Sequence, residues 1–184
     1  MAFLRAKDYD KQITTEDLTE VIGGDFALLL VAEQAAQAEM ESYLCHRYDV
    51  DKIFVDVPVF DEAETYVEGD VVWHVDINGT FYTCLADTVA GEDPIDTPAK
   101  WQAGDTRPAQ IITYLIDITL YHLHARINPR NIPELRGQRR DEAINWLKMI
   151  NEGKISSKLT LLATPEKPGL SIKWESNGKF NHKY

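Results

Sequence analysis

The side chains best suited by type to do chemistry are two histidines and the carboxylates of one acidic loop. His122 and His124 lie two positions apart in a predicted helix, so they point in different directions and cannot bind one metal ion together. Glu92, Asp93 and Asp96 form the acidic loop, but their spacing is not that of an EF-hand. No phosphate-binding loop, nucleophile elbow or pair of catalytic carboxylates occurs in the sequence. We therefore predict no enzyme activity, no metal site and no cofactor.

Four aromatic side chains could instead bind a sugar: Phe60, Tyr66, Trp73 and Trp101. Stacking on a sugar ring requires an aromatic face that is open to solvent. Packing inside a small core is the alternative, and it is the preferred interpretation for Tyr66 and Trp101. Trp73 occupies a strand position that is predicted to face solvent, so both interpretations stay open for it.

Charge limits the contacts that the chain can make with DNA. The formal net charge is -11, which argues against a general affinity for the phosphate backbone. Arg136, Arg139 and Arg140 gather near the start of the last predicted helix, where positive charge opposes the helix dipole. They could contact phosphates or the acidic surface of a partner, and a solvated helix entrance is the alternative.

The segments that position these residues are mainly helical, with a short β-rich segment between them. Capping and apolar spacing predict helices that start at Thr14–Asp17, run from Asp25 to Asp49 and from Arg107 to Ile127, and end with Gln138 to Glu152. Residues 60–104 have β character, and Asn78-Gly79 predicts a hairpin turn. A helical chain with a small inserted module follows from this order.

The third predicted helix is apolar around nearly its whole circumference. Only Thr113, Asp117 and His124 form a narrow polar strip along it. A helical body of this size has a limited core with which to surround such a helix. We therefore expect copies of the chain to cover one another there, and we assign four residues to an oligomer interface: Ile112, Leu115, Ile116 and Leu123.

The C-terminal segment differs from the helical part in composition. Thr164 to Gly169 is rich in proline and predicts a linker, and apolar residues then alternate at Leu170, Ile172 and Trp174. Such a segment gains order by docking on a partner, either as an added strand or through a buried aromatic side chain. We place these three residues in a partner interface, and a frayed terminus is the alternative.

Targeting signals are not evident in the 184 residues. No run of 18 or more apolar residues occurs, and the first residues lack the pattern of a signal peptide. We expect a protein that is made in the cytoplasm and that has no membrane partner.

The order and motifs of the helices resemble those of the small head-to-tail connector (adaptor) proteins of tailed phages. The last helix has a leading arginine, Arg139, then Ala143-x-x-Trp146-Leu147 and Ile150-x-x-Gly153-Lys154, as is typical of that family. The likeness covers about Leu4 to Leu159 apart from the insert. Where the family often has an aromatic residue after the leading arginine, this chain has Arg140.

This resemblance implies a structural role in the neck of a virion. It implies a ring of twelve copies beneath the portal protein, in contact with the next tail or neck ring protein. DNA would pass through the ring without specific binding, and the C-terminal segment would reach a neighbouring subunit or the portal.

The insert is similar to the chitin-binding type of carbohydrate-binding module. The likeness rests on Phe60-x5-Tyr66-x2-Gly69-Asp70, on Asn78-Gly79-x2-Tyr82-x-Cys84, and on Trp101-x2-Gly104. It implies a three-stranded miniature sheet and, as a possible ligand, a glycan. The family usually begins with tryptophan where this chain has Phe60.

Together these features predict a mainly α protein, a bundle of about four helices with an inserted three-stranded β module and an extended C-terminal arm. The expected units are a helical domain of residues 1–58 and 106–160, an inserted domain of residues 59–105, and an arm of residues 161–184. The expected function is that of a connector ring subunit, and the alternative is a virion attachment or decoration protein that binds carbohydrate through the insert.

Overall fold

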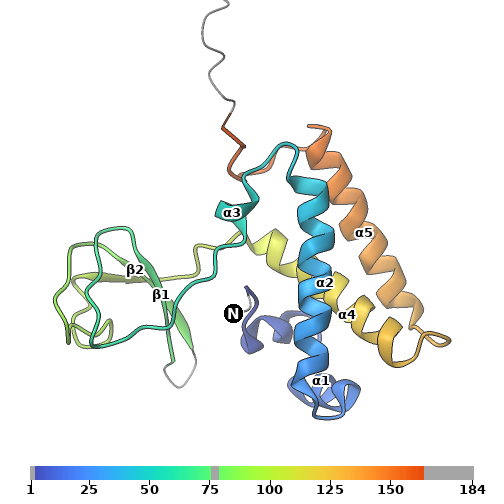
Figure 1. The fold of residues 1–184 in the computed structure, drawn as a ribbon, viewed down its shortest axis with the longest axis horizontal. Helices are drawn as coiled ribbons and strands as arrows, with labels where there is room; N and C mark the ends of the chain where they lie inside the picture. The colour runs from blue at the N-terminus through green and yellow to red at the C-terminus, as the bar shows by residue number, and fades with distance from the viewer. Residues whose placement is uncertain (1–2, 76–78, 164–184) are drawn as a thin grey trace, which may run out of the picture.

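The computed structural model describes residues 3–75 and 79–163, and it shows a helical body with a small β lobe beside it (Figure 1). The body consists of a 3-10 helix η1 (Ala6–Lys11) and the helices α1 (Thr15–Ile22), α2 (Phe26–Leu44), α3 (Val50–Ile53), α4 (Ala109–Ile127) and α5 (Glu134–Asn151). The lobe contains the strands β1 (Val71–His74), β2 (Thr80–Cys84) and β3 (Trp101–Ala103). The predicted fold class is confirmed. Leu170, Ile172 and Trp174 lie outside the described residues.

Local capping explains where the first helices begin. The Thr14 hydroxyl accepts a hydrogen bond from the Asp17 backbone N–H at 3.1 Å, and the Asp25 carboxylate accepts one from Ala27 at 3.0 Å. These bonds satisfy N–H groups that have no partner within the helix. Gly23 has a φ of 60° and ends α1 in the left-handed conformation that favours glycine. The last helix begins earlier than predicted, at Glu134.

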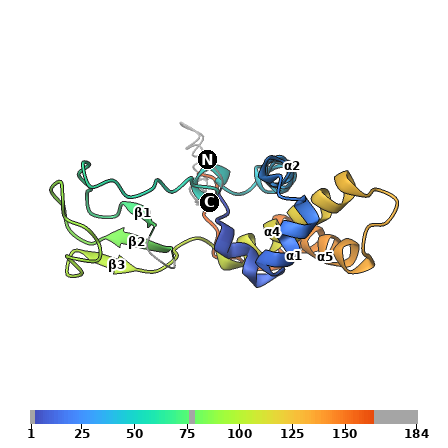
Figure 2. The same ribbon diagram turned by 90° about the horizontal axis from the view of Figure 1, so that it is seen from below.

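Helix α4 lies in the middle of the body, between α2 and α5 (Figures 1 and 2). Ile112, Leu115, Ile116 and Leu123 are each at most 1% exposed within the single subunit. The expectation that a lone subunit cannot cover this helix is therefore wrong, and the assignment of these four side chains to an oligomer interface loses its basis. The N-terminal segment supplies the cover that we did not predict, because it adds Phe3, Leu4 and Tyr9 to the core.

The polar strip of α4 carries a buried carboxylate. Asp117 is 4% exposed, and the nearest cation is Arg139, whose Nη1 lies 3.6 Å from its Oδ1. Burial raises the pKa of Asp117 above its ordinary value, although Arg139 and Arg136 act in the opposite direction. The ionised form is thus disfavoured in the folded protein.

We expect Asp117→Asn to raise the free energy of unfolding at pH 7, because the amide removes the cost of burying a charge. The pKa of Asp117 in the folded protein lies above its value in the unfolded chain, about 3.9. The loss of stability that ionisation of Asp117 causes is therefore absent below the unfolded pKa and appears as the pH rises through the folded pKa. Urea unfolding at pH 7 and near pH 3 measures the difference, with the exposed Asp141→Asn as the control variant. A loss of stability at pH 7 would show that the pair with Arg139 outweighs the cost of burial.

The lobe is an antiparallel sheet in the order β1-β2-β3, in register through Val72 with Tyr82 and Tyr82 with Ala103. Its small core consists of Val72, Cys84 and Trp101, with three aromatic side chains against them: Phe60, Tyr66 and Tyr82. The β1–β2 pairing agrees with the predicted hairpin, and Asn78 of the predicted turn lies outside the described residues.

Three of the four proposed sugar-stacking residues belong to this small core. The Phe60 and Tyr66 rings stack with centroids 5.5 Å apart, and the edge of Trp101 packs against both at 5.9 Å and 5.4 Å. Trp101 also donates its indole N–H to the Glu92 carbonyl at 3.2 Å. The rings cover one another because so small a lobe has few other apolar groups with which to form a core.

Candidate functional site

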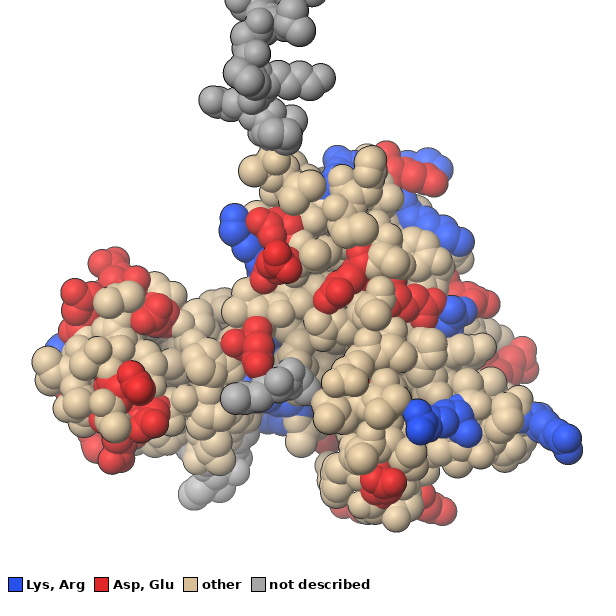
Figure 3. Space-filling view, viewed as in Figure 1, with Lys and Arg blue, Asp and Glu red and all other residues tan. Residues whose placement is uncertain are grey.

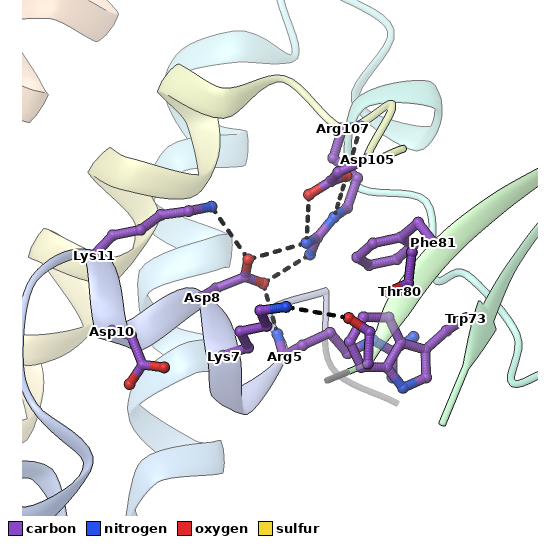
Figure 4. A pocket seen from close by; sticks show the side chains of 11 residues that line it. Arg5, Lys7, Asp8, Asp10, Lys11, Trp73, Thr80, Phe81, Asp105 and Arg107 are labelled. Atoms are coloured by element: carbon purple, nitrogen blue, oxygen red, sulfur yellow. Dashed lines mark hydrogen bonds and ion pairs between the residues drawn. The ribbon is translucent and has the colours of Figure 1, made fainter. Parts of the chain in front are cut away.

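A cavity of about 470 Å³ separates the helical body from the lobe, and the side chains around it join the two parts (Figure 4). Its walls come from η1, from the face of the sheet opposite the small core, and from the residues before α4: Arg5, Lys7, Asp8, Asp10, Lys11, Trp73, Gly79, Thr80, Phe81, Asp105 and Arg107. Trp73 lines this cavity, where it packs on Phe81 with ring centroids 4.7 Å apart. It therefore faces the body rather than open solvent.

Arg107 is the centre of the junction. Its side chain is 5% exposed and forms ion pairs with Asp8 at 3.0 Å and with Asp105 at 2.8 Å. It also donates to the Phe3 carbonyl at 2.6 Å, and its guanidinium lies 4.1 Å from the centroid of the Phe81 ring. Burial acts to lower the pKa of Arg107, but its bonds to Asp105 and Asp8 raise it above the ordinary value. The charge is thus fixed and fully paired.

Arg5 binds the second of the two connections between the body and the lobe. The lobe is entered through residues 54–59 and left through residues 104–108. Arg5 donates to the Val57 carbonyl of the entering segment, pairs with Asp56 at 3.9 Å, and lies 5.5 Å from the centroid of the Trp73 ring. The N-terminal segment, residues 5–8, thus holds both connections, one through Arg5 and one through the ion pair of Asp8 with Arg107.

This arrangement is suited to holding two parts in a fixed orientation rather than to binding an anion. The four cationic side chains at the cavity each have a partner in the structure: Arg5 and Lys7 with backbone carbonyls, and Lys11 and Arg107 with Asp8. Paired charges of this kind leave little affinity for a further ligand. Among the described residues, no group of three or more His, Cys, Asp and Glu side chains could hold a metal ion.

The remaining candidate residues are tied within the subunit. His122 lies 2.7 Å from Glu39, which also binds Arg140, while Arg139 binds Gln12. Burial and the nearby Arg136 lower the pKa of His124. In the acidic loop, Glu92 pairs with Lys100 at 2.6 Å and Asp93 with His74 at 3.0 Å. Arg139 and Arg140 therefore hold α5 to the rest of the body, rather than facing DNA.

An exposed apolar surface lies on α2 and was not predicted. Phe26, Leu30 and Val31 are 65%, 44% and 43% exposed, and Ala27, Ala35 and Ala38 are also exposed. Helix α2 lies at the edge of the body (Figure 2), so its outer face has no neighbour among the residues that the structure describes. We call these six residues the α2 outer face. The run Phe26 to Ala32 without a polar residue was the available signal, because a helix cannot bury all sides of such a run in one contact.

Negative charge is concentrated in the insert. Residues 59–105 contain eleven Asp and Glu but one Lys, a net charge of -10 out of -11 for the whole chain. Red side chains gather over the lobe in Figure 3 accordingly. The sequence alone shows this segregation of charge. It makes the lobe repel DNA and attract basic partners.

The structure thus defines a class of protein in which ion pairs and hydrogen bonds hold an acidic β lobe to a helical body. Residues 97–171 match the family model described as Bacteriophage Mu, Gp36. The matched range includes all of α4 and α5. No curated protein and no solved structure matches the chain.

This likeness relates the second half of the chain to a phage structural family. It supports a structural role in a phage, favours a non-enzymatic protein and suggests a place in the virion. No helix in the described part of the chain is long and apolar enough to cross a membrane.

Proposed function

We propose that this chain is a head-to-tail connector (adaptor) subunit of a tailed phage. Copies form a ring, of twelve subunits, that binds beneath the portal protein and meets the next tail or neck ring protein, so that DNA passes from the head. The observation that carries the proposal is the likeness to the phage Mu Gp36 family through α4 and α5, the helices that form the centre of the body. The resemblance of the helical order to known connectors supports it.

The α2 outer face supplies a surface for the contact between subunits. Exposed apolar side chains in one contiguous stretch are typical of a protein interface, because their transfer out of water is favourable. A ring closes when one face of each copy binds a different face of the next. The residues outside the insert carry a net charge of only -1, so the channel of a ring that they form has little attraction for DNA.

Val31→Asp tests this interface. We expect it to weaken the contact between subunits by about 100-fold or more, because an unpaired carboxylate in an apolar interface costs about 3 kcal/mol. The measurement is the mass of the complex that forms when the chain is produced together with the portal protein of its phage. The variant should remain folded by circular dichroism and lose the ring.

Asn145→Asp is the matched control, since it adds the same carboxylate to an exposed position of α5. It should assemble as the unaltered chain does. Rings of full mass with Val31→Asp would exclude the α2 outer face as the subunit contact, and the absence of any complex between the unaltered chain and the portal would contradict the connector role.

The alternative function, attachment to a glycan through the insert, has less support. Phe60, Tyr66 and Trp101 pack on one another, and Trp73 lies at the junction beside Arg5. Replacing Phe60 to Gly104 by a short Gly-Ser linker separates the two functions. A connector should still bind the portal and complete particles, whereas an attachment protein would assemble and lose binding to glycans.

A further inference from the structure

A second groove, unrelated to the junction, lies between the entering connection and the start of the lobe. Its volume is about 680 Å³. The wall is apolar on one side, with Val55, Val57, Val59 and Val71, and Val55 and Val59 are exposed to solvent. An apolar surface of this kind, open to water, favours a covering partner.

The rim of this groove is acidic and lacks cations. Asp61, Glu64 and Asp70 line it, and within residues 3–75 and 79–163 no lysine or arginine forms an ion pair with any of the three. Asp61 accepts the backbone N–H of Ala63, and Asp70 that of Val67, so these two carboxylates shape their own turns. The carboxylates keep acceptor sites beyond these bonds, and they belong to a lobe whose net charge is -10. A partner that suits this groove is apolar on one side and basic on the other.

Such a segment exists in the same chain. Residues 164–184 contain four Lys and two Glu, a net charge of +2 in a chain of -11. Leu170, Ile172 and Trp174 alternate with polar residues, so that in an extended conformation they share one side, while Lys173 lies on the other. The composition of this segment therefore complements both the valines and the acids of the groove.

The point at which the described chain ends also suits this partner. Leu162 donates to the Arg47 carbonyl at 2.9 Å, and Thr160 accepts from Asp49, the residue that caps α3. Helix α3 leads directly into Val55–Val59, the wall of the groove. Six residues, Thr164 to Gly169, span up to about 20 Å when extended, which brings Leu170 within reach of that wall.

We infer that Leu170–Trp174 docks in the groove of its own subunit, with its apolar side chains on the valines and with Lys167 and Lys173 near Asp61, Glu64 and Asp70. Attachment to the same chain favours this partner over another copy, because the effective concentration of a tethered segment is high. Another apolar groove, beside Trp146 and Leu159, is also near the end of the described chain. Residues 106–163, which form it, carry a net charge of +4 and would repel a lysine-rich segment.

A nitroxide beside the groove tests the inference on the full chain. Cys45→Ser removes the exposed thiol, Cys84 is buried, and Ala63→Cys then places one label next to the groove. The reporter is the indole N–H signal of Trp174 in nitrogen-15 spectra, assigned with Trp174→Phe. We expect the oxidised nitroxide to abolish this signal and chemical reduction to restore it. A signal that is unchanged by the label would overturn the proposal.

Three further samples test whether the rim charges hold the segment and whether it docks on its own subunit. Neutralising the rim by Asp61→Asn, Glu64→Gln and Asp70→Asn should restore the Trp174 signal, whereas the same loss of charge at Glu16, Asp17 and Glu20 of α1 should not. An isotope-labelled chain without nitroxide, mixed with an unlabelled chain that carries it, should keep its Trp174 signal. Broadening in that mixture would show docking on a second copy and would contradict docking within one subunit. Neither outcome depends on whether the protein forms a ring on the portal.

Discussion

Arg107→Met is expected to lower the free energy of unfolding by about 3–5 kcal/mol, because it leaves the buried Asp8 carboxylate without its main partner. Asp8 is 6% exposed, and apart from Arg107 its cationic partner is Lys11 at 3.3 Å on the surface side. The substitution also removes the guanidinium from the Phe81 ring and from the Phe3 carbonyl. Urea unfolding followed by circular dichroism measures the loss.

The combination of Asp8→Asn with Arg107→Met is the control for this prediction. Because the double variant leaves no unpaired buried charge at Asp8, it should be more stable than Arg107→Met alone, and the double-mutant cycle should give a clear coupling energy. Additive effects, or a loss below about 1 kcal/mol for Arg107→Met, would mean that the pair does not hold the junction together.

Trp101→Ala is expected to unfold the lobe while the helical body remains folded. Truncating a buried tryptophan costs about 3–5 kcal/mol, which is as much as a core of this size supplies. Trp101 is 4% exposed and contacts Phe60 and Tyr66, and no residue of the body belongs to that cluster. Hydrogen exchange should show lost protection in β1, β2 and β3 and unchanged protection in α4.

Trp73→Ala is the matched control on the opposite face of the same sheet. It removes contacts with Phe81 and Arg5 at the junction but leaves the core of the lobe intact. We expect a smaller loss of stability and full protection of the three strands. Equal exchange in the two variants, or loss of protection in α4 with Trp101→Ala, would show that lobe and body unfold as one unit.

Much of the fold could be predicted because local signals agree with it. Thr14 and Asp25 cap helices as their types suggest, and Gly23 ends α1. The aromatic and glycine pattern of residues 60–104 predicts a small sheet, and β1, β2 and β3 form one. In each case a few neighbouring residues fix the local structure, so that tertiary contacts are not needed for the prediction.

The position of the exposed apolar surface is only partly evident from the sequence, since it depends on which helix lies in the middle. Both α2 and α4 are rich in apolar residues, and the sequence does not state which is surrounded. The N-terminal segment, residues 3–11, contributes to this difference, because it adds Phe3, Leu4 and Tyr9 to the core that contains α4. The exposed apolar residues are consequently Phe26, Leu30 and Val31 of α2.

The junction was missed for a similar reason. Asp8 and Arg107 are 99 positions apart, and neither stands in a motif that would mark it. Trp73 was expected to face solvent because strand alternation gives the side of the sheet on which a residue lies but not what packs against that side. Its place beside Arg5 follows only from the way in which the N-terminal segment contacts both connections of the lobe.

Imaging the neck of the assembled virion by cryo-electron microscopy tests the connector role most directly. We expect a closed ring of this chain against the portal, with the α2 outer face in contact with the neighbouring subunit and the acidic lobe projecting from the helical body. A neck without this chain, or copies found only on the outer capsid or at the tail tip, would contradict it.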